Sequence, residues 1–396
     1  MPRPKRLLAR SVAALLAFAA PAAATAATYI GQVVASGLNN PRGLAFGPDG
    51  GLYIAESGTL SPSGPEAVIR GVTYRYGPTG SITQLLGGAQ SRIVTGLPSI
   101  ATLAGMDQTG PNDIVFGANG VGYVLVGLGA DPALRGGAFA PGGVGLGSLH
   151  SFTPGGATSL FADLARIEAT FNPAGGALDS NPFHIVPNGT GFLATDAGSN
   201  TLLNVAADGA VTLRSVFPPR FIGPPPPQSD AVPTGVAVAP DGTIYVAELT
   251  GFPFTQGAAR IYRIATDGTP AVAYTGFTNL TDIAFGPDGA LYALELDTNG
   301  LAAPGGTGAL IRVGADGSRE VLFSQGLVAP TGLAIGADGA FYVANFSAAA
   351  GQGQVLRISA VPEPATWALL IGGFAFVGAA MRRRPTADAY GARADT

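Results

Sequence analysis

Acidic and amide side chains recur at three kinds of position in this 396-residue chain. The first kind ends a short apolar run, and its members are Glu56, Asp196, Glu248, Glu295 and Asn345. The second kind begins an apolar run, and its members are Asn112, Asp113, His184 and Asp282. The third kind lies just before the proline of such a run, at Asp107, Asp179 and Asp230. Oxygen ligands of this type hold hard cations, so rings of these residues would suit Ca²⁺.

His184 is the candidate catalytic residue, because a histidine can act as a general acid or base near neutral pH. That role requires a neighbouring carboxylate, such as Asp113 or Asp179, and a pKa near the working pH. Every acid also has a simpler alternative. A carboxylate at the end of a strand often only accepts hydrogen bonds from loop N–H groups or faces water.

Six Gly-rich turns give these residues a common frame, because each turn joins two short apolar strands. They span residues 47–50, 117–120, 188–191, 239–242, 286–289 and 336–339. A repeat of about 40 to 50 residues with paired strands is typical of a β-propeller. In the fourth repeat, residues 233–239, 243–248, 259–265 and 271–276 supply four strands with alternating β-branched and aromatic residues.

The sixth repeat supplies only three strands, at residues 331–335, 340–344 and 354–359. Residues 29–37 near the other end of the chain resemble the fourth strands of earlier repeats. Pairing them with the last repeat closes the ring and removes the exposed edges that an open sheet would present. The sequence therefore predicts an all-β fold, a six-bladed propeller over residues 28–360 that an N-terminal strand closes.

The long insertions all fall where first strands begin and second strands end, which is one face of the ring. We call it the loop face. The connections on the other face are predicted to be tight turns, including residues 77–80, 153–156, 206–209, 265–268 and 314–317. Loops grafted on one side of a rigid scaffold commonly carry binding or catalysis. The sequence therefore places the functional site on the loop face.

Both ends of the chain carry targeting features. Residues 1–27 have a basic start, an apolar stretch over residues 12–20 and small residues at 24–26, which is the pattern of a secretory signal peptide. Residues 361–384 combine Pro362, Glu363 and Pro364 with an apolar span and Arg382, Arg383 and Arg384. A short polar tail, residues 385–396, follows.

Composition limits the compartment and the partners. The chain has no cysteine, which excludes thiol and zinc-thiolate chemistry. Residues 28–360 contain 13 arginines, no lysine and 22 acids, a net charge of −9. Such a surface repels the phosphates of nucleic acid. Cations and neutral polymers fit it better.

Three resemblances add expectations. The C-terminal pattern resembles the PEP-CTERM signal, which implies export in a Gram-negative bacterium, a transient inner-membrane tether and cleavage by an exosortase. Residues 233–248 resemble an NHL-type repeat, and residues 110–114, 179–182, 248–253 and 257–263 resemble the ScyD/ScyE family of exported propellers. The chain is also loosely similar to gluconolactonase-like propellers, which implies a divalent metal; of the ligand positions only Asn112 is matched, and Thr234, Thr281 and Thr331 replace the others.

Two function hypotheses follow. The first is a cell-surface or secreted binding propeller associated with an exopolysaccharide or a small ligand. The sorting pattern favours it, as does the lack of a recognisable catalytic motif. The second is a divalent-metal-dependent hydrolase or lyase with its site on the loop face, which the acids and His184 favour.

Overall fold

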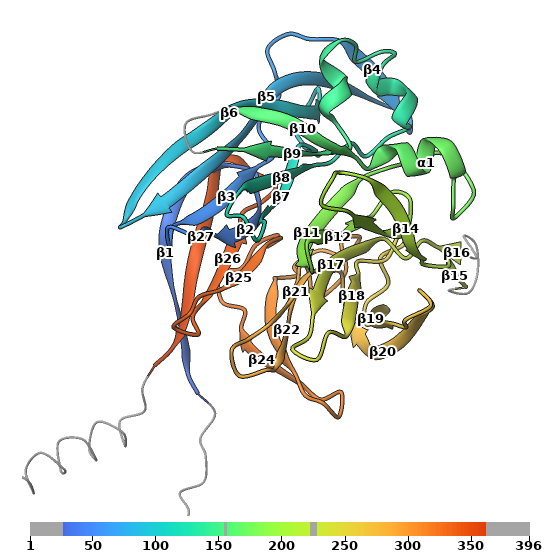
Figure 1. Ribbon diagram of the computed structural model, residues 1–396. Helices are drawn as coiled ribbons and strands as arrows, with labels where there is room; N and C mark the ends of the chain where they lie inside the picture. Colours follow the sequence, from blue (N-terminus) through green and yellow to red (C-terminus); the bar gives the residue numbers. More distant parts are fainter. Residues whose placement is uncertain (1–26, 154–156, 222–227, 362–396) are drawn as a thin grey trace, which may run out of the picture. The chain divides into compact units, whose positions relative to one another are not determined.

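The computed structural model describes residues 27–153, 157–221 and 228–361. Within these residues, six antiparallel sheets of four or more strands follow one another around an axis in sequence order (Figure 1). Neighbouring first strands contact each other, and β2 (Pro41–Phe46) contacts β25 (Leu333–Ile335), so the ring closes. The six-bladed propeller predicted from the repeats is confirmed.

In the second to fifth blades, four strands follow one another in chain order from the axis outward. The second blade contains β7 (Pro111–Phe116), β8 (Gly122–Val126), β9 (Ser148–Phe152) and β10 (Thr158–Asp163). The third contains β11 (Pro182–Asn188), β12 (Gly191–Asp196), β13 (Thr201–Val205) and β14 (Val211–Val216). The fourth contains β17 (Pro233–Val238), β18 (Ile244–Glu248), β19 (Ala259–Ile264) and β20 (Pro270–Phe277). The fifth contains β21 (Leu280–Phe285), β22 (Leu291–Glu295), β23 (Ala309–Val313) and β24 (Arg319–Phe323).

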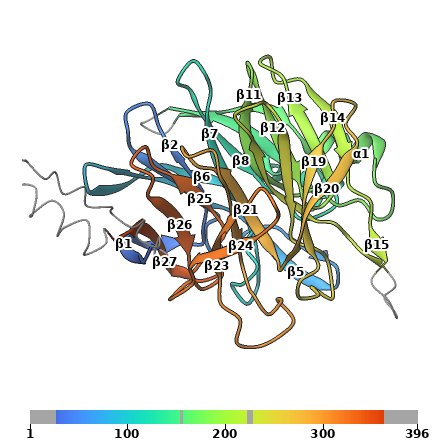
Figure 2. The same cartoon turned by 90° about the horizontal axis from the view of Figure 1, so that it is seen from below.

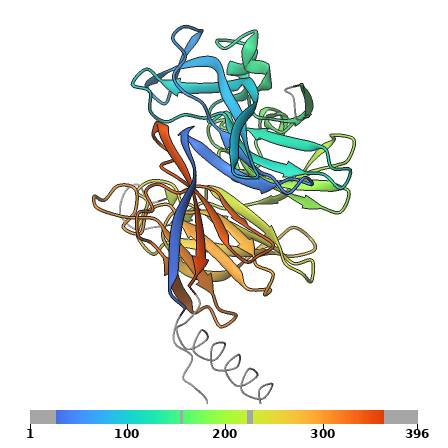
Figure 3. The same cartoon turned by 90° about the vertical axis from the view of Figure 1, so that its left-hand side faces the viewer.

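The sixth blade joins the two ends of the propeller. Its strands are β25, β26 (Phe341–Asn345), β27 (Ala350–Ala360) and β1 (Tyr29–Asn39). β1 pairs with β27 in antiparallel register, with Tyr29 opposite Ala360, and Figure 3 shows the two strands side by side. The predicted closure by an N-terminal strand is therefore confirmed. Without β1, the backbone hydrogen-bonding groups of β27 would be an open edge.

The first blade departs from the prediction. It contains β2, β3 (Leu52–Glu56), β5 (Val72–Leu86) and β6 (Ala89–Thr102). An additional strand, β4 (Glu66–Ile69), pairs with the N-terminal residues of β5. The tight turn predicted at residues 77–80 is wrong, because β5 continues through these residues. The chain reverses instead at Gly87 and Gly88, both with positive φ, as a two-residue hairpin requires. β4 and the adjoining halves of β5 and β6 extend this blade on the loop face.

Side chains between the blades form the core. Tyr123, Leu125 and Leu149 of the second blade pack with Phe192 and Leu203 of the third, and similar buried clusters lie between other blades. Most inner turns are fixed by one recurring contact: Asp49, Asp241, Asp288 and Asp338 each accept a hydrogen bond from the N–H two residues on. The core and these turns hold the inner strands, and so the residues along the axis, in fixed positions.

The insertions on the loop face carry the remaining elements. Short helices lie in two of them: η1 (Pro132–Arg135) and η2 (Gly142–Gly145) after β8, and α1 (Ala165–Phe171) before β11. β15 (Arg220–Phe221) and β16 (Gln228–Ser229) form a small ribbon at an outer edge of the propeller (Figures 1 and 2).

Candidate functional site

Six equivalent positions on the inner strands meet at the propeller axis, and glycine occupies three of them. They are Gly43, Asp113, His184, Gly235, Asp282 and Gly332. A Cβ on Gly235 would lie 2.6 Å from the nitrogen of Ile283, and one on Gly332 would lie 2.2 Å from a backbone oxygen of Arg42. The glycines therefore give the space in which the other three side chains fit.

Those three side chains form an axial cluster of His184, Asp113 and Asp282. Nε2 of His184 lies 2.9 Å from Oδ1 of Asp282 and 3.5 Å from Oδ2 of Asp113. The His184 side chain is 12% exposed, and the two aspartates are nearly fully buried. The structure thus places His184 beside Asp113, as a general acid or base would require, whereas Asp179 pairs with Arg70 elsewhere on the loop face.

Electrostatics favour a charged histidine in this cluster. Burial alone would lower the pKa of His184, but the attraction of Asp282 and Asp113 outweighs it and raises the pKa to about 9. Burial raises the pKa of Asp113 to about 6, although His184 opposes that rise. The backbone nitrogen of Val236 lies 3.3 Å from Nδ1, a contact that favours a neutral ring. The two carboxylates therefore favour the protonated ring, whereas the hydrogen bond that the Val236 N–H donates to Nδ1 favours the neutral one.

The axial cluster also joins blades together. The two oxygens of Asp113 accept the N–H groups of Ile114 and Ile185, and those of Asp282 accept the N–H groups of Ile283 and Leu333. Each aspartate therefore bridges its own blade to the next one. Because the backbone and the carboxylates contact both ring nitrogens of His184, neither nitrogen presents a free lone pair to a substrate.

The metal-ligand positions implied by the gluconolactonase-like resemblance also form hydrogen bonds between neighbouring blades. Asn112 donates to the carbonyl oxygen of Pro182 at 2.8 Å. The hydroxyl groups of Thr234, Thr281 and Thr331 likewise donate to backbone carbonyls of the following blade. The three threonine hydroxyl groups and the amide nitrogen of Asn112 are therefore engaged in contacts between blades, and these positions lack the carboxylates of a divalent metal site.

The acids at the ends of the second strands bind loop backbone. Glu56 accepts the N–H of Asn39, Asp196 that of Asn181, and Glu295 that of Thr278. In each case the donor lies just before the first strand of the same blade. Asn345 repeats the contact with Val328. The second strands lie one place out from the axis, so these acids fix loop entries rather than surround the channel mouth.

Glu248 has side-chain partners, as Glu56 also does with Arg92 and Thr83. Glu248 accepts a hydrogen bond from the hydroxyl of Tyr262 at 2.8 Å, and Arg220 lies 3.3 Å away. Burial raises the pKa of Glu248 to about 7, and burial does the same for Glu295. These contacts do not bring the second-strand acids together as the predicted Ca²⁺ ring. Among the described residues, no group of three or more histidines, cysteines or acids could hold a metal ion.

The third set of acids lies in the loops. Asp107 accepts a hydrogen bond from the hydroxyl of Tyr74. Asp179 binds Arg70, whose Nη1 lies 2.5 Å from Oδ2. Asp179 and Asp230 line a pocket on the loop face with a volume of about 420 Å³. Four separate insertions contribute to its wall. The long loops that the sequence placed on this face therefore meet around one cavity.

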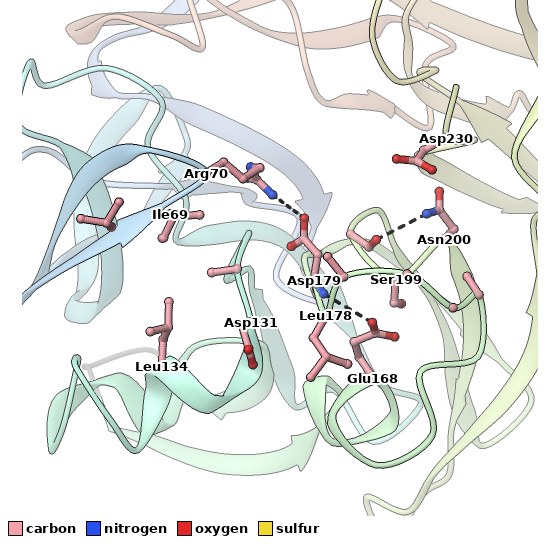
Figure 4. Close-up of a pocket in the computed structure, with 17 residues that line it drawn as sticks. Ile69, Arg70, Asp131, Leu134, Glu168, Leu178, Asp179, Ser199, Asn200 and Asp230 are labelled. Carbon is pink, nitrogen blue, oxygen red and sulfur yellow. Dashed lines mark hydrogen bonds and ion pairs between the residues drawn. The ribbon is translucent and has the colours of Figure 1, made fainter. Parts of the chain in front are cut away.

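We call this cavity the loop-face pocket (Figure 4). Its polar wall contains Arg70, Asp131, Glu168, Asp179 and Asp230, and its apolar wall is aliphatic. Repeat analysis missed Arg70, Asp131 and Glu168, because they lie in insertions that have no counterpart in the other blades. The only hint in the sequence is the pair Arg70-Gly71, which is typical of a tight turn and would place Arg70 at the tip of a hairpin. In the structure Arg70 has a positive φ in the turn between β4 and β5.

A second cavity of about 500 Å³ lies along the axis. The axial cluster borders it at Asp113 and His184, while Phe46, Phe116 and Phe285 line its other parts. Because these aromatic residues end the first strands, this cavity extends from mid-depth toward the face that carries the tight turns. His184 therefore lies inside the channel and not at its mouth on the loop face.

Comparisons with known proteins identify the C-terminal signal. The PEP-CTERM protein-sorting motif matches residues 360–384, which include Pro362, Glu363, Pro364 and the three arginines. The motif is a signal for exosortase and indicates an exported protein with membrane-linked sorting in Gram-negative bacteria. The apolar span lies outside the described residues, as does the signal peptide. Within the part of the chain that the structure covers, no helix is long and apolar enough to cross a membrane.

Solved structures with the same fold include enzymes. A gluconolactonase from Xanthomonas campestris is 8% identical, with a TM-score of 0.51, over 84% of this chain and 89% of that chain. A putative gluconolactonase is 12% identical, with a TM-score of 0.49, over 84% and 93%. A streptogramin B lyase is 16% identical, with a TM-score of 0.45, over 84% and 98%. At such low identity the match to the gluconolactonase from Xanthomonas campestris shows the fold alone, and no curated protein sequence matches significantly.

Proposed function

We propose that this chain is an exported propeller that acts as a binding module and holds its ligand in the loop-face pocket. One observation carries the proposal: four insertions on one face assemble a cavity of about 420 Å³ with both charged and aliphatic walls. Ligand sites are concave, with a few polar groups on a largely apolar lining. The sorting motif supports a ligand outside the cytoplasm, such as an exopolysaccharide.

The axial cluster supports binding rather than catalysis as the main function. Its histidine has both ring nitrogens in contact with other groups, and its aspartates bridge blades. We further propose that the chain is related to the ScyD/ScyE family of exported propellers. Release to the cell surface or the medium after sorting belongs to the same proposal.

A binding experiment with a pocket-filling variant tests the proposal. Ala177 lines the loop-face pocket, and a tryptophan there would occupy the cavity. Ala302 is an exposed alanine in another insertion and provides a matched control. We expect the purified protein to bind at least one polysaccharide from a panel of neutral, acidic and amino polymers in calorimetry. Ala177→Trp should weaken binding at least tenfold, and Ala302→Trp should not.

Failure of the whole panel to bind, or equal binding by both variants, would overturn the site. Circular dichroism and a thermal melt of each variant establish that the fold is retained.

A second candidate function is a hydrolase or lyase that uses His184 at the axial cavity. His184 beside two carboxylates, at the wall of a cavity of about 500 Å³, is an arrangement capable of proton transfer. Its test is a screen of lactone and ester substrates with and without added Ca²⁺. Turnover that His184→Gln abolishes, while polysaccharide binding persists, would establish an enzyme in place of a simple binding module.

A further inference from the structure

The loop-face pocket has an excess of negative charge. Asp131, Glu168, Asp179 and Asp230 line it, against the single guanidinium group of Arg70. One oxygen of Asp131 is engaged, because it accepts the N–H of Ala133 at the start of η1. The other acids come from the loops before β11 and β17. This balance opposes an anionic ligand and favours a cationic one.

Two carboxylate oxygens of this pocket have no hydrogen-bond partner. They are Oε2 of Glu168 and Oδ1 of Asp179, and both are buried. Glu168 is only 2% exposed, and its other oxygen receives one long hydrogen bond of 3.4 Å from the N–H of Asp179. In Figure 4 the Glu168 side chain extends from α1 among the lining residues, near Asp179. Buried acceptors without donors are rare in folded proteins, so these oxygens indicate a missing donor.

Arg70 shows how a cation enters this site. Its guanidinium group contacts Oδ2 of Asp179 at 2.5 Å and the carbonyl oxygen of Gly129 at 3.1 Å. The Arg70 side chain is nevertheless 63% exposed, at the tip of the hairpin between β4 and β5. An exposed pair of this kind is weak and easily exchanged. A ligand cation can therefore compete with Arg70 for Asp179, and Glu168 lies in the wall of the same pocket.

We propose that the loop-face pocket recognises a protonated amine carried on an aliphatic or sugar body. This inference rests on the proposed function and names its ligand chemistry. The carboxylates are too dispersed for a metal ion, since no set of three within the described residues could hold one. An ammonium group with three donors can instead bridge separate oxygens. Val68, Ile69, Leu134 and Leu178 supply an aliphatic wall for the rest of the ligand.

Calorimetry with four probes tests the chemistry and its source. The probes are a glucosamine disaccharide, its fully N-acetylated counterpart, spermidine and CaCl₂. Acetylation removes the charge and keeps the sugar rings. We expect the glucosamine disaccharide or spermidine to bind, with an affinity that falls as salt is added, and the acetylated sugar to bind at least tenfold more weakly. The tighter of the two amines identifies the source, an amino polysaccharide or a free polyamine.

Variants that remove one charge test whether the pocket binds a cation, because loss of an acid and loss of Arg70 should change the affinity in opposite directions. Glu168→Gln and Asp179→Asn should each weaken amine binding at least tenfold, whereas Asp297→Asn, in a different loop-face insertion, should leave it unchanged. Arg70→Ala should tighten binding at least twofold, because it removes the competing cation. Arg70 is exposed, so this variant remains informative if a buried substitution disturbs folding.

The possible failures are distinguishable. Weaker amine binding by Arg70→Ala would overturn the cationic ligand. Equal binding of the acetylated sugar would also overturn it, and would leave the proposed binding function standing. Ca²⁺ binding that Glu168→Gln abolishes, without amine binding, would replace the amine by a metal. Absence of binding by every probe and by the polysaccharide panel would overturn both proposals.

Discussion

At the residue scale, the axial cluster shows how three charged side chains share a buried space. Around the axis Asp113 and His184 are neighbours, Gly235 separates His184 from Asp282, and Gly332 and Gly43 complete the ring. A side chain on any of these glycines would meet backbone or carboxylate atoms of the next blade at less than 3 Å. The charges are stable there because each aspartate accepts two backbone hydrogen bonds as well as facing the histidine.

The raised pKa of His184, to about 9, predicts a pH-dependent stability. The folded protein holds this proton more tightly than the unfolded chain, whose histidine has a pKa of about 6.5. The stabilisation is therefore complete below about pH 6.5 and disappears as the pH rises through about 9, a loss on the order of 3 kcal/mol. Urea unfolding at several pH values measures it.

His184→Gln should remove this part of the pH dependence, because glutamine does not titrate. Nuclear magnetic resonance of the ring nitrogens at neutral pH gives an independent readout and should show both of them protonated. Parallel stability curves for the two proteins, or a neutral ring at pH 7, would contradict the assignment.

At the scale of elements, the sixth blade depends on the two ends of the propeller. β1 and β27 pair over most of their length, with irregularities near Ala35 and Leu38. Ala35 and Leu38 of β1 are buried in a core cluster with Leu44, Ile54 and Val355. β1 therefore covers an edge and also supplies side chains to the contact between the first and last blades.

Removal of β1 should open the propeller. A protein that lacks residues 1–39 exposes the edge of β27 and loses the buried side chains of Ala35 and Leu38. We expect a lower melting temperature by several degrees and self-association in light scattering. The matched control lacks residues 1–27 only and should remain monomeric. Equal melting temperatures and a monomeric truncated protein would show that the closure strand is dispensable.

At the scale of the whole molecule, the sorting motif and the propeller have separate roles. The motif covers residues 360–384, and the propeller ends with β27 at Ala360. The only tryptophan of the chain, Trp367, falls within the motif. Processing therefore has an optical signature that does not depend on the ligand.

Cleavage by an exosortase should leave a mature protein without tryptophan. We expect the protein recovered from the surface or medium of an exosortase-bearing host to lack emission when excited at wavelengths selective for tryptophan. Its intact mass should correspond to loss of the C-terminal segment. The same protein from a host without exosortase is the control and should retain Trp367. A full-length C-terminus in both hosts would make this a membrane-anchored propeller.

The sequence by itself determined the blades and the C-terminal sorting motif. Turn chemistry such as Asp49 and Asp288 acts over two residues, strand alternation acts over five or six, and the sorting motif is linear, so each is visible without a fold. The first blade was the exception, because the glycines at 77 and 80 suggested a turn and the pairing of β5 with β6 overrode them.

Only the tertiary structure decided which polar residues meet. Glu56, Asp196 and Glu295 occupy equivalent positions at the ends of second strands, which suggested a ring of metal ligands. Each instead accepts a hydrogen bond from a nearby backbone N–H, since the second strands lie away from the axis. Arg70 and Asp179 are 109 residues apart and meet because insertions of different blades converge on the loop face. Insertions have no repeat register, so contacts between them depend on the packing of whole loops, which no local pattern encodes.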